Sequence, residues 1–102
     1  KTYVSQIPAL IKLFEYHLRN DNMLEANKIF DEIFKLSDDV DRLTDLCFSY
    51  KNHDHYKESV EKIDYLYDNL KDNKEYVLLK KSKLIKDLGK KIIKSITILF
   101  IW

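Results

Sequence analysis

The feature that most restricts the fold is a self-similarity at a spacing of 33 residues. Shifted by that spacing, the first part of the chain aligns with the second without a gap, and apolar positions meet apolar positions. The clearest pairs are Ile7 with Val40, Leu10 with Leu43, Leu13 with Leu46, Phe30 with Ile63, and Ile33 with Leu66. Each apolar run has the three- to four-residue spacing of an amphipathic helix. The repeat therefore predicts pairs of helices joined by short polar turns.

A third unit follows at a spacing of 35 residues for its first helix and 36 for its second, with Gly89 near the turn between them. The units cover approximately residues 5–37, 38–72 and 73–102, and a helix pair with two loops needs roughly this length. A single Gly and a single Pro leave too few turn signals for a many-stranded sheet. We predict one all-α domain of six helices, arranged as three antiparallel hairpins stacked into a short α-solenoid.

The charges are distributed unevenly along the chain. Residues 1–70 carry 9 basic and 14 acidic side chains, whereas residues 71–94 carry 9 lysines and three acidic residues. This asymmetry is typical of solvated helix faces, and an anionic partner or a membrane surface is the alternative. The chain opens with Lys1 and no signal-peptide pattern. We expect a fragment of a longer intracellular, cytoplasmic protein.

The second unit resembles a tetratricopeptide repeat. The matching positions are Leu46, Cys47, Tyr50, Tyr56, Ser59 and Ile63. The Trp of the first helix, the Gly after its Leu and the Pro that closes each repeat of that family are missing here. The resemblance implies a right-handed solenoid that acts as a non-enzymatic scaffold and binds a peptide or partner subunit in a concave groove.

The resemblance also implies which residues line that groove, because the first helix of each hairpin faces it. These residues are Ile11, Glu15, Arg19, Thr44, Phe48, Lys51, Asn52, Leu79, Lys83 and Lys86. The lysines would make one end basic, which suits an acidic peptide or a carboxylate terminus. The run LEANKIFDEI is also similar to the pentatricopeptide repeat, and RNA binding is the alternative function. The base-reading positions of that family fall on Pro8, Asp41 and Tyr76, which do not look like a base-reading set.

The stretch His53-Asp54-His55 has the residue types of a metal or catalytic site. Zinc needs three or four converging ligands, and no second cluster of ligands appears in the sequence. In the repeat alignment this stretch is the polar turn inside the second hairpin, where Asp54 is expected to cap the following helix. Cys47 falls on a small-residue packing position, which favours burial over nucleophilic chemistry. We expect no enzyme activity, no metal and no cofactor.

The C-terminal run IIKSITILFIW is apolar at eight of its eleven positions. It is too short to span a bilayer, which needs about 20 residues, unless the run continues in a longer protein. The alignment favours the second helix of the third hairpin, and a membrane anchor is the alternative. The exposed face expected on this helix would pack against further repeats or another subunit. It comprises Ile98, Phe100, Ile101 and Trp102.

Overall fold

The computed structural model describes the backbone of residues 4–101 and the side chains of residues 5–94. A short 3₁₀ turn, η1 (Val4–Gln6), leads into five α-helices, and residues 4–101 contain no strand. The helices are α1 (Ile7–Arg19), α2 (Met23–Leu36), α3 (Val40–Asn52), α4 (Tyr56–Asn69) and α5 (Lys74–Ile101). The all-α prediction is confirmed, but the six-helix solenoid is not.

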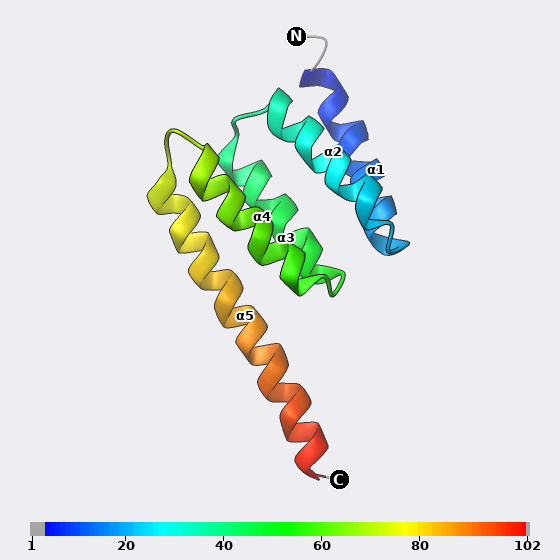
Figure 1. Cartoon of the computed structure of the whole chain (residues 1–102), viewed down its shortest axis with the longest axis vertical. Helices are drawn as coiled ribbons and strands as arrows, with labels where there is room; N and C mark the ends of the chain where they lie inside the picture. The colour runs from blue at the N-terminus through cyan, green and yellow to red at the C-terminus, as the bar shows by residue number, and fades with distance from the viewer. Residues whose placement is uncertain (1–3, 102) are drawn as a thin grey trace.

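The first four helices form two antiparallel hairpins, α1–α2 and α3–α4, which lie side by side (Figure 1). The turn inside each hairpin has the same construction. Asp21 and Asp54, 33 residues apart, adopt left-handed backbone conformations with φ of 56° and 68°. The N–H of the residue after each aspartate donates to a carbonyl five residues earlier, at 2.8 Å in both turns. This bond pattern closes a helix at a left-handed residue.

Asp54 therefore ends α3 and does not cap α4, so the expected capping role was wrong. The N-cap of α4 is His55, whose side chain makes no capping bond. The turn geometry gives the physical reason, because a residue with positive φ lies outside the following helix and satisfies the carbonyls of the preceding one.

The core lies between the two hairpins and is centred on Tyr50 of α3, whose side chain is fully buried. Its ring contacts Phe14 of α1 edge-on at a centroid distance of 5.2 Å and Phe30 of α2 at 6.1 Å. Ala26 and Ser59 occupy equivalent places on α2 and α4 and are both fully buried. Their small side chains are the ones expected where a second helix approaches its neighbours closely.

The last helix, α5, is one continuous 28-residue helix. The predicted break at Gly89 is absent, because this glycine does not have a positive φ and lies within the helix. Glycine is only a preference at a helix end, and the two lysines that follow it favour a helix. The turns at residues 20–22 and 53–55 instead consist of Asn, Asp and His, which favour non-helical backbone. The fifth and sixth predicted helices are therefore one helix.

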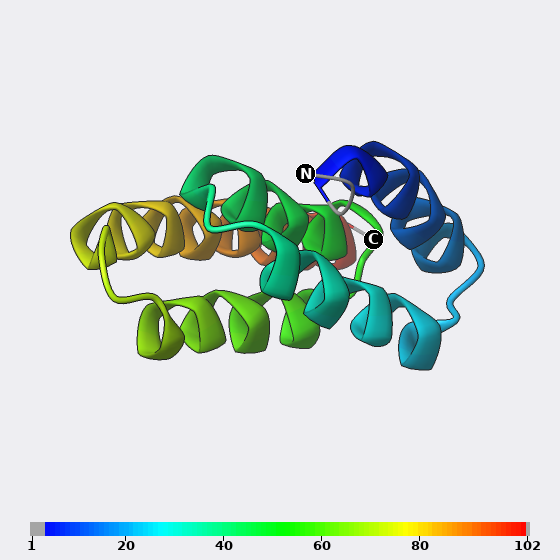
Figure 2. The same cartoon turned by 90° about the horizontal axis from the view of Figure 1, so that it is seen from above.

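The first half of α5 packs against α3 and α4 through the face that carries Val77 and Leu84. Val77 and Leu84 are fully buried, whereas Leu78, Leu79 and Ile85 are 46%, 66% and 48% exposed. In a third hairpin, the sixth helix would fold back onto α5 and cover these exposed residues. Figure 1 shows α5 instead passing the turn between α3 and α4, so that its C-terminal end projects beyond the hairpins. Figure 2, seen from above, shows α1, α3 and α5 in one layer and α2 and α4 in a second layer.

Candidate functional site

An open groove of about 420 Å³ lies between α1 and α3. Its walls come from the first helices of the two hairpins and from the connection between α2 and α3. The lining residues are Ile11, Glu15, Asp39, Asp41, Arg42, Asp45, Leu46 and Ser49. This is the side of the hairpins on which the family resemblance places a binding groove.

The groove has an apolar floor and an acidic rim. Ile11 provides half-buried aliphatic surface, and Leu46 lies beneath it as a core residue that is 3% exposed. Four carboxylates and one guanidinium line the same groove, so its local charge is strongly negative. Carboxylates gathered on the rim of an apolar groove attract cationic groups and repel anionic ones.

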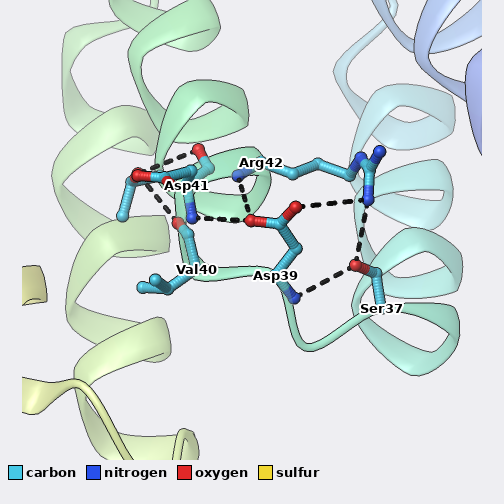
Figure 3. Close-up of polar contacts among 6 residues, drawn as sticks. Ser37, Asp39, Val40, Asp41 and Arg42 are labelled. Carbon is cyan, nitrogen blue, oxygen red and sulfur yellow. Dashed lines mark hydrogen bonds and ion pairs between the residues drawn. The ribbon is translucent and has the colours of Figure 1, made fainter.

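Two of the rim residues hold the local backbone in place. The carboxylate of Asp39 accepts the N–H groups of Asp41 and Arg42 at 3.1 and 3.3 Å and so caps α3 (Figure 3). The guanidinium of Arg42 lies 3.7 Å from the same carboxylate and donates to the hydroxyl of Ser37 at 3.3 Å. Asp39 is therefore the N-cap of α3.

Asp41 connects the groove to α5, because it accepts a hydrogen bond from the Tyr76 hydroxyl. This bond to Asp41 raises the pKa of Tyr76 above its ordinary value. In contrast, the side chains of Glu15 and Asp45 make no hydrogen bond or ion pair among the described residues. They are the two carboxylates of the groove whose removal leaves the known contacts of the fold intact.

Sequence reasoning placed Ile11 and Glu15 in the groove, and both line it. Arg19 and Asn52 lie exposed at the last positions of α1 and α3. Thr44 is fully buried, and its hydroxyl donates to the backbone carbonyl of Val40 at 2.9 Å. A buried side chain cannot contact a ligand, so Thr44 is removed from the binding residues.

Phe48 and Lys51 are brought together, but as part of the attachment of α5. Lys51 Nζ lies 3.3 Å from Asp87 of α5 and 5.3 Å from the centre of the Phe48 ring. The Lys51 side chain is only 12% exposed, and Phe48 packs against the core. The expected basic end of the groove therefore lacks Lys51, because the charge of this lysine is already paired with Asp87.

Leu79, Lys83 and Lys86 lie exposed on α5. Lys86 lies on an open face of that helix together with Leu78, Lys81, Ser82 and Ile85, apart from the acidic groove. The exposed face expected at Ile98, Phe100, Ile101 and Trp102 falls outside the residues whose side chains are described.

Sequence reasoning missed the acidic rim residues of α3. Asp39 and Asp45 were not assigned to the groove, and Asp41 was considered only as a base-reading position. The available signal was the run DDVDR at 38–42, which places several charges in the first turn of a helix that faces the groove. Recognising it required knowledge of how α1 and α3 are oriented.

The other reactive residues of the sequence lie apart from the groove. Cys47 is fully buried, as predicted, and burial raises the pKa of its thiol. His55 Nε2 lies 3.1 Å from the Asp21 carboxylate, which links the turns of the two hairpins. Within residues 5–94 no three His, Cys, Asp or Glu side chains are grouped so that they could hold a metal ion.

Comparisons of the chain with protein-family models, curated proteins and solved structures give no match. In the part of the chain that the structure describes, no helix is both long and apolar enough to cross a membrane.

Proposed function

We propose that this protein is a non-enzymatic binding scaffold that holds an extended basic peptide in the groove between α1 and α3. The observation that carries the proposal is the combination of the half-buried aliphatic side chain of Ile11 with four carboxylates around it. Lysine and arginine side chains have apolar stems and cationic ends, so they fit a groove of this composition. The acidic rim favours a basic ligand over the acidic one expected from the sequence.

The internal contacts of the lysine-rich segment also favour this choice over RNA binding. Lys81 pairs with Asp64 at 2.6 Å, and Lys91 lies 3.6 Å from Asp54. The ammonium groups of Lys74 and Lys80 lie over the rings of Tyr67 and Tyr76. Charges engaged in such contacts contribute less to binding phosphates than the sequence count suggests, because ligand binding would have to compete with them.

The test uses the double variant Glu15→Gln/Asp45→Asn and a fluorescein-labelled peptide of alternating lysine and leucine. We expect the wild-type chain to bind this probe, and the double variant to bind it at least fivefold more weakly at low salt. The affinity should fall with added salt, because exposed charges are screened. Fluorescence anisotropy measures both effects.

The matched control is Asp31→Asn/Glu32→Gln, which removes the same number of charges from exposed positions of α2, outside the groove. If this control weakens binding as much as the groove variant, the peptide responds to net charge and the groove is not its site. Equal binding by the groove variant and the wild type would reject the proposal.

A further inference from the structure

The first half of α5 exposes a face that is covered in the second hairpin. At the spacing of 35 residues, Leu78, Ser82 and Ile85 correspond to Leu43, Cys47 and Tyr50 of α3. Those three residues of α3 are fully buried, whereas the three of α5 are exposed, Leu78 to 46% and Ile85 to 48%. In the second hairpin α4 packs against α3, and the first hairpin adds Phe14 and Phe30 against the Tyr50 ring. Among the described residues, no helix of the same chain packs on α5 in the way that α4 packs on α3.

Gly89 marks the position at which that partner helix would begin. At the same spacing of 35 residues it corresponds to Asp54, which in turn corresponds to Asp21. These two aspartates are the left-handed residues that turn the chain in the two hairpins. Gly89 is helical, and a Cβ added to it would meet nothing within 4 Å. Close packing therefore does not explain a glycine in the middle of α5, whereas a left-handed turn would.

One contact between successive turns of the repeat is found again at Lys91. In the first two units, the turn residue Asp21 contacts His55, which directly follows the next turn residue, Asp54, at 3.1 Å. At the spacing of 36 residues His55 corresponds to Lys91, and Lys91 contacts the next turn residue, Asp54, at 3.6 Å. Lys91 therefore keeps this contact, although α5 runs straight through Gly89, where the repeat would turn.

Residues 90–101 have the pattern of the missing helix but do not reach its place. Ile92, Ser95 and Leu99 correspond in sequence to Tyr56, Ser59 and Ile63 of α4. In a continuous helix, residue 101 lies about 18 Å beyond residue 89 along the axis. The same segment of another molecule, running antiparallel, could lie on the exposed face of α5, and Ile92 and Ile93 are themselves more than half exposed.

From these observations, we infer that two copies of this chain exchange residues 90–101, so that each completes the third hairpin of the other. The pair is a domain-swapped dimer with two-fold symmetry, in which the two α5 helices run antiparallel and the two Gly89 residues lie near the axis. The surface that each copy offers is the face of Leu78, Ser82 and Ile85. It lies on a different helix from the peptide groove, so the two proposals can fail independently.

The first test is the oligomeric state of the full 102-residue chain, measured by light scattering after size exclusion across a concentration series. We expect a dimer, and we expect Ile85→Lys to shift it to the monomer, because a lysine would enter the swapped interface. The control, Leu24→Lys, changes a 68% exposed leucine of α2 and should leave the dimer intact. A monomeric wild-type chain would overturn the inference, and so would a dimer that Ile85→Lys does not weaken.

The second test separates an exchanged helix from one folded back within the same molecule. Spin labels on Glu75→Cys and Ile101→Cys lie about 39 Å apart along a continuous α5. They would lie about 10–15 Å apart if residues 90–101 folded back onto α5, because packed helices are separated by about 8–10 Å. With labelled chains diluted in unlabelled ones, only the long distance agrees with the inference, and a dominant short distance overturns it.

A third variant, Gly89→Ala, keeps the test independent of the interface residues. Alanine favours the continuous helix and disfavours the left-handed turn. The association constant of the dimer should therefore rise by about fivefold for each of the two residues 89 that are replaced. The open space around Gly89 accommodates the added methyl group. A weaker dimer in Gly89→Ala would contradict the exchange.

Discussion

Tyr50 is the residue on which the packing of the two hairpins depends most. Its hydroxyl donates to Asn27 Oδ1 of α2 at 2.7 Å, and its ring is fully buried against Phe14 and Phe30. Replacing Tyr50 with Phe keeps the ring and removes this bond between the hairpins. We expect Tyr50→Phe to lower the free energy of unfolding in urea by about 1 kcal/mol.

The exposed Tyr65 provides the control, because Tyr65→Phe removes a hydroxyl from a side chain that is 41% exposed. Equal effects of the two substitutions would contradict the role of Tyr50. A second readout is the dependence of stability on pH. Burial raises the pKa of Tyr50 in the folded chain, so the unfolded chain loses the proton first above about pH 10. Stability contributed by the neutral hydroxyl is then present below this pH and falls above it, and Tyr50→Phe removes that fall.

At the scale of single helices, α3 depends on its N-cap. Asp39 accepts two backbone N–H groups at the start of this helix, and the helix supplies both core and groove residues. Asp39→Ala should lower the free energy of unfolding by about 1 kcal/mol. Asp39→Ser should keep most of the stability that the cap contributes, because serine is also a good N-cap residue. Asp38→Ala is the matched control, since Asp38 is an exposed neighbour outside the cap. A loss in Asp38→Ala equal to that in Asp39→Ala would show that general charge, and not capping, is responsible.

The individual helices also differ in how well their bounds and packing can be predicted from the sequence. Helices α1 to α4, the cap at Asp39 and the burial of Cys47 follow from apolar spacing and from polar residues that favour turns and caps. The course of α5 does not, because it depends on a balance between the turn preference of Gly89 and the helix preference of Lys90 and Lys91. The groove was only partly predictable, because a carboxylate on a helix surface gives no sign of what lies opposite it.

At the scale of the whole molecule, the body measures 56 × 32 × 17 Å. In a row of helices as thin as this one, each helix is covered only by its immediate neighbours. A helix that lacks a neighbour therefore has an exposed face. The last helix is attached through one face alone, where Val77 and Leu84 are buried and ion pairs lie along the edges. The position of α5 therefore decides both the Tyr76–Asp41 contact at the groove and the surface offered to a second copy.

The ion pair between Lys51 and Asp87 is the contact that should hold α5 most specifically. The two side chains are only 12% and 28% exposed, and a pair so shielded from water is screened less than one at the surface. We expect a double-mutant cycle of Lys51→Met and Asp87→Asn to give a coupling energy of about 1 kcal/mol in urea unfolding. The exposed pair Lys57–Glu61, at 3.8 Å, should give less than about 0.5 kcal/mol in the same cycle. Salt at 1 M should abolish the second coupling and leave most of the first. If the two couplings are equal, then apolar packing at Val77 and Leu84, and not this ion pair, determines where α5 lies.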